Sequence, residues 1–547
     1  MNKRLISILL CVVLVLGVFT ACGSNNDNKV NQKQDNIEEN NNSNDAEENA
    51  AGTVYSSSAS INLDKEYYYQ SYKYLQKENS KNYGVDSADE IVFQSVYYDE
   101  LCYLLSQEGT YLILFGGDWC PNTTSVIDYI NYYANLYGVN TVYNFDFRLD
   151  GENRDSHIRE DIIYQTSYTG EDKPESSLNG ADYNYLYGEL VDNFLTNIND
   201  WVEYQVGTDS DLTYLDVNEE EQTVAKVQVP FLFLYDKDNT VDNSGAVREE
   251  GYTNESGNYP IVYGFEKMVY RDSEGGEAVY TSSKEQNEST LVDDYAQQLE
   301  NAIFKHIGDG EVTLGNYTKE DYIREAFEIN ERGHAFKTEA SFSEDEQINI
   351  RTITYSQLKW LLQQEGNFLI LFGGAWCANT QAAVATINDY AVENDLIVYM
   401  FDVRLDGKYP IDFWGYPRSR EFQIRSDSNP FRYLYVDLIT NYLTNLVTID
   451  EEQKISYTDE NGEEHVVNRL QAPYFMAYNK DAVDKDGFPA PVTGYYEEML
   501  ELIDTGDTYI YNAENYARYK AGTYGVITAY GEHAGITIKD ITVDRAK

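Results

Sequence analysis

The sequence predicts an α/β protein made of two tandem domains, each with a central mixed sheet that is mostly parallel. Three observations lead to this prediction. The string LILFGGDWCPNT at 112–123 recurs as LILFGGAWCANT at 369–380. In both halves, apolar runs typical of buried strands alternate with segments of helical spacing, and they do so in the same order. At 547 residues, the chain is also long enough for two or three domains with separate cores.

The elements of each copy can be followed in order. Segments 89–109 and 346–366 open with alternating apolar residues, which predict a strand, and continue with leucines at helical spacing up to a glycine. The LILF run then predicts a strand buried on both faces, and a helix follows the cysteine. The next strand, at 141–151 or 397–407, ends in the shared string FDxRLDG.

The second part of each copy is also repeated. A helix-like block at 185–197 matches 433–445, and strands that begin near Pro230 and Pro473 follow. A helix is predicted over 319–333, between the two copies. The predicted divisions are a signal peptide, a tether, domain 1, a linker and domain 2, at 1–21, 22–59, 60–306, 307–340 and 341–547.

The N-terminus has the features of an export signal. Lys3 and Arg4 precede an apolar run that ends in Thr20-Ala21-Cys22, and this run is shorter than the roughly 20 residues of a membrane span. A cysteine directly after a small residue resembles a bacterial lipoprotein signal. That resemblance implies a lipid anchor on Cys22 and a location on the extracytoplasmic face of the cell membrane; a plain secretory signal is the alternative. The following polar stretch, up to residue 59, predicts a disordered tether.

The composition restricts the partners that the chain can bind. It contains 93 acidic and 40 basic residues, with a formal net charge of −53. Such a charge repels phosphate backbones, so we expect no nucleic-acid partner. High acidity also keeps a protein soluble, and we interpret most of the acidic residues as serving this general role.

The cysteines predict neither a disulfide framework nor a metal site. If Cys11 leaves with the signal and Cys22 is acylated, three thiols remain, which is an odd number. Cys102 aligns with Lys359 and is predicted to lie off the buried face of its helix. The five histidines are isolated from cysteines, so no metal and no cofactor is expected.

The segments around the other two cysteines resemble the thioredoxin-like fold. The resemblance is carried by the apolar strand that leads into Trp119-Cys120 or Trp376-Cys377 and by the proline that opens a later strand, Pro230 or Pro473. It implies that the peptide bond before this proline is cis and that the proline lies against the cysteine, beside a substrate groove. The stretches 152–228 and 408–471 are long for this family and are interpreted as insertions.

The lone cysteines limit the chemistry. A cysteine at a helix N-terminus is favoured as a thiolate, and Thr123 or Thr380 could donate a hydrogen bond to the sulfur. However, these threonines occupy the place of the second cysteine of a redox pair. The family's buried carboxylate is also missing, because leucine stands six residues before each cysteine. A self-contained dithiol oxidoreductase is therefore disfavoured.

Two functions remain open at this point. The first is monothiol disulfide exchange, isomerase-like or assisted, with Cys120 and Cys377 as nucleophiles acting on extracytoplasmic protein thiols or with an external thiol donor. The alternative is a non-catalytic binding lipoprotein that holds a protein, peptide or glycan. Whether the chain is an enzyme is left open. The FDxRLDG string is interpreted as a structural ion pair and turn, with a ligand contact as its alternative.

Overall fold

The computed structural model describes most of the chain beyond the predicted tether. The described residues are 61–151, 157–159, 183–202, 211–216, 218, 220–246, 257–267, 269–271, 279–280, 295–333, 342–407, 422–429, 431–459, 461–497 and 513–545. The predicted signal peptide, Cys22 and the tether lie outside them. None of the helices within these ranges is long and apolar enough to cross a bilayer.

The first domain is built on a five-stranded mixed sheet. Its order is β1-β3-β2-β6-β7, in which β1 and β2 run parallel to β3 while β6 is antiparallel to its neighbours. The strands are β1 (Phe93–Ser95), β2 (Tyr111–Phe115), β3 (Val142–Phe145), β6 (Phe231–Tyr235) and β7 (Ile261–Glu266).

Side chains of β2 point alternately to the two faces of the sheet, and each face packs against a different hydrophobic cluster. Ile113 and Phe115 join the cluster that contains α2 (Tyr98–Ser106) and α5 (Tyr185–Phe194). Leu112 and Leu114 join the cluster that contains α3 (Pro121–Leu136). The sheet is therefore covered by helices on both faces, which explains why every residue of β2 is buried.

The second domain repeats this sheet. Its order is β10-β12-β11-β15-β16, with the same mixture of parallel and antiparallel pairs. The strands are β10 (Ile350–Ile353), β11 (Phe368–Phe372), β12 (Val398–Phe401), β15 (Tyr474–Tyr478) and β16 (Val492–Glu497); the helices are α9 (Tyr355–Leu361), α10 (Ala378–Glu393), α11 (Arg432–Asn441) and α12 (Ala513–Ala534). Two tandem α/β domains with mixed sheets are thus confirmed. The sheets are not mostly parallel as expected, because each has two parallel and two antiparallel strand pairs.

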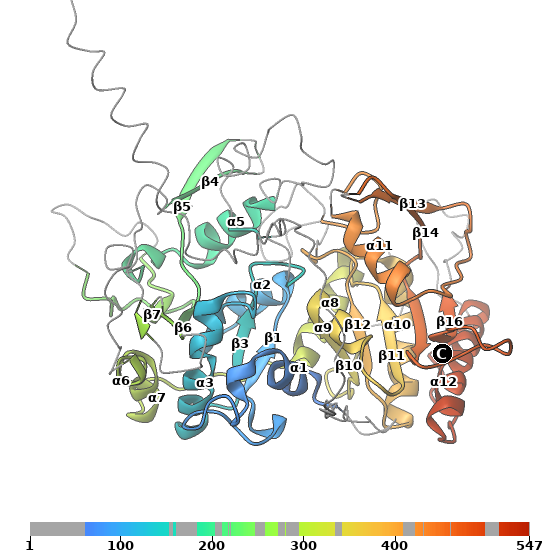
Figure 1. The fold of residues 1–547 in the computed structure, drawn as a ribbon, viewed down its shortest axis with the longest axis horizontal. Helices are drawn as coiled ribbons and strands as arrows, with labels where there is room; N and C mark the ends of the chain where they lie inside the picture. The colour runs from blue at the N-terminus through green and yellow to red at the C-terminus, as the bar shows by residue number, and fades with distance from the viewer. Residues whose placement is uncertain are drawn as a thin grey trace, which may run out of the picture.

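Each domain carries an extra hairpin within the predicted insertion. These are β4 (Asp211–Leu215) with β5 (Glu221–Ala225), and β13 (Lys454–Thr458) with β14 (Glu464–Asn468). The first packs on α5 and the second on α11, at the top of Figure 1. Domain 1 also contains β8 (Val269–Tyr270), β9 (Val279–Tyr280), α6 (Tyr295–Leu299), a π-helical turn (Glu300–Phe304), α7 (Lys305–Gly308) and short 3-10 turns at Lys73–Leu75, Ala88–Glu90 and Ile198–Asp200.

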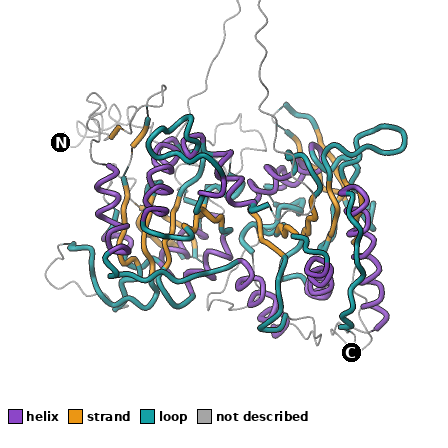
Figure 2. Tube along the Cα trace, turned by 90° about the horizontal axis from the view of Figure 1, so that it is seen from below, coloured by secondary structure: helices purple, strands orange, loops and turns teal. Residues whose placement is uncertain are grey.

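Two helices lie where the domains meet. α1 (Leu63–Ser71) contacts both β1 and α9, and α8 (Lys319–Gly333) contacts β10 (Figures 1 and 2). The helix predicted over 319–333 is therefore confirmed.

Hydrogen bonds link α2 of the first domain to the second half of the chain. Glu100 accepts hydrogen bonds at its two carboxylate oxygens, from Tyr317 Oη at 2.6 Å and from Thr352 Oγ1 at 3.1 Å. Tyr322 Oη donates to Asp99 at 2.9 Å. The face of α2 that would be exposed in an isolated domain is thus covered.

This covering explains one wrong prediction. Cys102 was expected off the buried face of its helix, but its exposed fraction is 2%. α8 and the segment before it lie against α2, and the rings of Tyr103 and Tyr322 meet edge to face with centroids 5.6 Å apart. The alignment with Lys359 fails as a guide because α9 is not enclosed in the same way.

Candidate functional site

Both cysteines lie where a strand gives way to a helix. Cys120 is the N-cap residue of α3 and Cys377 that of α10, with almost identical backbone angles (φ −90° and −95°, ψ 116° and 115°). Their carbonyl groups accept the first helical hydrogen bonds, from the backbone nitrogens of Thr124 and Gln381 at 2.9 Å. The expected position at a helix N-terminus is therefore present in both domains.

The later prolines lie beside the cysteines. The Val229–Pro230 and Ala472–Pro473 peptide bonds are both cis. Cys120 Sγ donates a hydrogen bond to the carbonyl oxygen of Val229 at 3.5 Å, and Cys377 Sγ donates to that of Ala472 at 3.2 Å. The structure thus brings together the cysteine and the proline strand, as the thioredoxin-like resemblance implied.

Both thiols are buried. The exposed fraction is 0% for Cys120 and 9% for Cys377, and no disulfide joins the three described cysteines. Each sulfur is also in contact with the backbone carbonyl that precedes the proline. Disulfide exchange needs a sulfur that a substrate can reach, and the sulfurs are largely enclosed in this conformation.

The two threonines contribute packing rather than hydrogen bonds. The hydroxyls of Thr123 and Thr380 are buried and form no hydrogen bond with any residue that the structure describes. The expected donation to sulfur is therefore not made here. Each threonine instead fills the space beside a glycine: a Cβ on Gly116 would lie 2.7 Å from Thr123 Cγ2, and one on Gly373 would lie 2.7 Å from Thr380 Oγ1.

A tryptophan–aspartate pair lies next to each cysteine. Trp119 Nε1 donates to Asp146 Oδ1 at 2.8 Å, and Trp376 Nε1 donates to Asp402 Oδ1 at 2.9 Å. Burial raises the pKa of Asp146 and of Asp402 to about 7, although these hydrogen bonds act in the opposite direction. Each motif therefore does contain an acid, half-buried in domain 1 and buried in domain 2, but it directly follows the neighbouring strand instead of standing at the leucine positions.

The second glycine of each FGG string makes room for this pair. A Cβ on Gly117 would overlap with Trp119 Nε1 and the Asp146 carboxylate, and one on Gly374 would overlap with the equivalent atoms of domain 2. Only a residue without a side chain allows the backbone to pass so close.

The arginine of FDxRLDG lies on the tryptophan of each domain. We call the tryptophan, the aspartate and this arginine together the platform. The guanidinium of Arg148 lies 3.9 Å from the ring centroid of Trp119, and that of Arg404 lies 3.9 Å from the ring centroid of Trp376. The aspartate of each string also accepts a hydrogen bond from the backbone of its arginine at 2.8 Å. These contacts favour the structural interpretation of the string over a ligand contact.

A short piece of each insertion lies against this platform. Ile158 donates its backbone N–H to Phe147 and Ile424 donates to Val403, both at 3.0 Å. The ring of His157 meets that of Trp119 with centroids 5.1 Å apart. The insertions therefore return to the tryptophan–cysteine motif.

An arginine follows in both insertions. Arg159 Nη1 donates to the carbonyl of Val227, and Arg425 Nη1 donates to that of Leu470 at 2.6 Å. Burial lowers the pKa of Arg425 to about 10, and the nearby sulfur of Cys377 acts in the opposite direction. Sequence reasoning missed these arginines. The sequence does contain a signal for them: the dipeptide Ile-Arg occurs in both insertions, at Ile158-Arg159 and at Ile424-Arg425.

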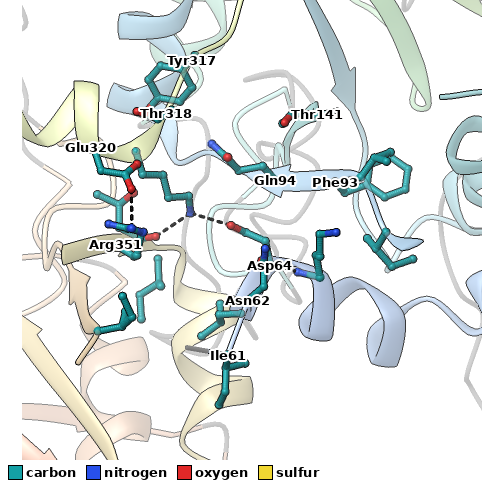
Figure 3. A pocket seen from close by; sticks show the side chains of 18 of the residues that line it. Ile61, Asn62, Asp64, Phe93, Gln94, Thr141, Tyr317, Thr318, Glu320 and Arg351 are labelled. Carbon is teal, nitrogen blue, oxygen red and sulfur yellow. Dashed lines mark hydrogen bonds and ion pairs between the residues drawn. The ribbon is translucent and has the colours of Figure 1, made fainter. Parts of the chain in front are cut away.

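A separate cavity of about 410 Å³ lies between the domains (Figure 3). It is lined by residues of α1, β1, α8 and β10, and neither Cys120 nor Cys377 is among them. Four of its charged groups form two ion pairs: Lys319 with Asp64 at 3.4 Å, and Arg351 with Glu320 at 2.5 Å. This cavity is therefore distinct from the predicted groove.

Comparison with known proteins does not identify the function of this site. No protein-family model matches the chain, and no curated protein matches it. What the fold and the contacts establish is a chain of two tandem α/β domains, each with a buried thiol held between a helix N-terminus and the strand that follows a cis peptide bond.

Proposed function

We propose that the chain is an anchored lipoprotein whose two thioredoxin-like domains bind a protein, peptide or glycan without disulfide chemistry. The observation that carries the proposal is the burial of both sulfurs, Cys120 completely and Cys377 to all but 9%. Disulfide exchange requires a thiolate that can reach a substrate disulfide. A thiol closed off and bonded to a backbone carbonyl does not meet that requirement.

The thioredoxin-like assignment is supported by three shared features. Both sheets have the same strand order, both cysteines cap a helix that follows the central strand, and both later strands follow a cis X-Pro bond. Both domains depart from the family pattern in the same two ways. Each has threonine in place of the second cysteine, and each has an insertion that packs over the tryptophan.

The covering segments argue for a structural role of the motif. In the thioredoxin-like resemblance, substrate backbone pairs beside the cis proline. Here the carbonyl before each proline already accepts the cysteine S–H, and a buried arginine bonds to a carbonyl two residues further upstream. The groove is thus filled by the chain itself. Other surfaces would then bind the ligand.

The location forms part of the proposal. The charged start, the apolar run and the Ala21-Cys22 junction support a lipid anchor on the extracytoplasmic face of the cell membrane. Two acyl chains on such a cysteine would provide stable anchoring.

Monothiol exchange remains the second candidate, and one observation favours it in domain 2. Cys377 is the less buried of the two, with an exposed fraction of 9% against 0% for Cys120, so a substrate disulfide could reach it more easily. In this alternative, Cys377 rather than Cys120 would be the nucleophile.

Thiol alkylation distinguishes the two functions. Two variants would be prepared, Cys102→Ala/Cys377→Ser and Cys102→Ala/Cys120→Ser, so that each retains one of the two motif thiols. Rates with iodoacetamide would be measured between pH 6 and 10 by intact mass, in native buffer and in urea. We expect both thiols to react far more slowly in the native protein. Rapid native alkylation at neutral pH, with a midpoint below the ordinary value of about 8.5, would support exchange and overturn the binding proposal.

A further inference from the structure

We propose that the β13–β14 hairpin is a binding site for a divalent transition-metal ion, with Asp459, Glu463 and His465 as its ligands. One ligand atom from each of these residues lies within 4.8 Å of the other two. The site is remote in sequence from both cysteines and does not depend on their chemistry.

The register of the hairpin explains why the three side chains converge. Tyr457 pairs with His465 and Thr458 with Glu464, and the Asp459 backbone N–H bonds to the Glu463 carbonyl at 2.9 Å. Side chains alternate between the two faces of a strand. His465, Glu463 and Asp459 therefore share one face, although they are spread over seven positions of the sequence.

Asp459 is held in a fixed orientation. Its Oδ1 accepts hydrogen bonds from the backbone nitrogens of Asn461 at 2.9 Å and Glu463 at 2.8 Å. Its Oδ2 is directed to the imidazole, with a distance of 3.3 Å to His465 Nε2. Asn461 Nδ2 also donates to this oxygen, at 3.5 Å. One carboxylate oxygen thus builds the turn, while the other faces the imidazole and would exchange its long contact with Asn461 for the ion.

The donor set selects the class of ion. Zinc binds imidazole nitrogen at about 2.0–2.1 Å and carboxylate oxygen at about 2.0–2.2 Å, so its ligand atoms are about 3.3–3.5 Å apart in a tetrahedron. The Asp459–His465 separation already fits, and the exposed Glu463 side chain can close the remaining gap by rotation. A nitrogen ligand with two carboxylates suits zinc better than calcium or magnesium, which prefer oxygen ligands alone.

The hairpin of the first domain shows that the histidine is not needed for the turn. Asp216 there accepts hydrogen bonds from the backbone nitrogens of Asn218 at 2.8 Å and Glu220 at 2.9 Å, as Asp459 does in domain 2. The position of His465 is taken by Gln222, whose Nε2 donates to Asp216 Oδ2 at 3.1 Å. The same turn therefore forms with an amide that is a poor metal ligand.

A cavity adjoins the proposed site. His465 lines a space of about 320 Å³ together with Tyr433, Tyr457, Asp437 and Lys359. An ion on the imidazole would lie at the rim of this cavity. Because three protein ligands leave coordination positions open, a small molecule in the cavity could reach the ion.

Zinc titration of the full-length chain, without a histidine tag, tests the proposal. By isothermal titration calorimetry we expect one principal site in the unaltered protein. His465→Gln reproduces the residue of domain 1 and should retain the hairpin, yet it should raise the Kd for zinc by at least about tenfold, since loss of even an outer partner costs about 10–100-fold. Glu463→Gln should also weaken binding.

The matched control is Glu464→Gln, which removes the same charge from the opposite face of the same strand. It should leave the Kd unchanged. The proposal is overturned if the unaltered chain has no single principal site or if His465→Gln binds zinc as the unaltered chain does. It is also overturned if Glu464→Gln weakens binding as much as Glu463→Gln, because the acidic surface alone would then account for it.

Discussion

Replacing Glu100 with glutamine should make the protein more stable above neutral pH. This carboxylate has an exposed fraction of 1% and lies between the domains, bonded by Tyr317 and Thr352. Burial raises its pKa from the ordinary 4.5 to about 7, although the nearby Lys319 acts in the opposite direction. Glutamine has the same shape and never ionises. Its amide oxygen can accept from Tyr317, and its amide nitrogen can donate to the Thr352 hydroxyl, so that the second hydrogen bond reverses its direction.

The magnitude follows from the two pKa values. Between pH 4.5 and 7 the folded protein retains a proton on Glu100 that the unfolded chain releases, so the stability due to this group falls as the pH rises through this window. Each pKa unit corresponds to about 1.4 kcal/mol. The free energy of unfolding of Glu100→Gln, relative to the unaltered chain, should therefore rise by about 3 kcal/mol between pH 4 and pH 8.

Urea unfolding, followed by tryptophan fluorescence at pH 4, 6 and 8, measures this difference. Domain 2 provides the matched control, because the position equivalent to Glu100 is the fully buried Gln357. Gln357→Glu should introduce the opposite trend, with stability lost as the pH rises. A difference between Glu100→Gln and the unaltered chain that stays constant with pH would refute the reasoning.

Three further predictions follow from other contacts. Arg271→Met should lower the free energy of unfolding in urea by about 3–5 kcal/mol, because it leaves the buried carboxylate of Asp128 without its ion-pair partner at 2.7 Å. An additional Asp128→Asn substitution should recover part of this loss. If it recovers nothing, the ion-pair explanation is contradicted. Gly374→Ala should cost about 1–3 kcal/mol and shift tryptophan emission, because its Cβ would overlap with Trp376; an unchanged melting temperature would argue against this. Gln222→His should create a second zinc site, and a calorimetric stoichiometry that stays at one would contradict the proposed ligand set.

Most of the fold could be predicted from the sequence because its signals are local. The helix over 319–333 was located to the residue, and the shared LILF run correctly marked the central strand of each sheet. The contact between domains could not be predicted in this way. Glu100 and Thr352 are 252 positions apart, and nothing in either segment identifies the other as its partner.

The site was predicted only in part, for a related reason. Helix N-terminal signals and the proline positions place Cys120 and Cys377 correctly, but burial depends on segments that return from the insertions. The proposed metal ligands were overlooked because Asp459 and His465 become neighbours only when the hairpin register is known. A histidine judged isolated by its sequence neighbours is thus not isolated in the fold.

The arrangement between the domains bears on how the protein avoids self-association. β1 and β10 are outermost strands, and an exposed edge can pair with the edge of another molecule. Here Asp64 accepts the backbone N–H of Ser95 in β1 at 3.0 Å, and Lys319 donates to the carbonyl of Thr352 in β10 at 2.7 Å. These two outermost strands are thus each capped by a charged side chain from a helix at the interface. Removal of α1 would leave the outer edge of β1 without this cap, and that edge could then pair with a strand of another molecule.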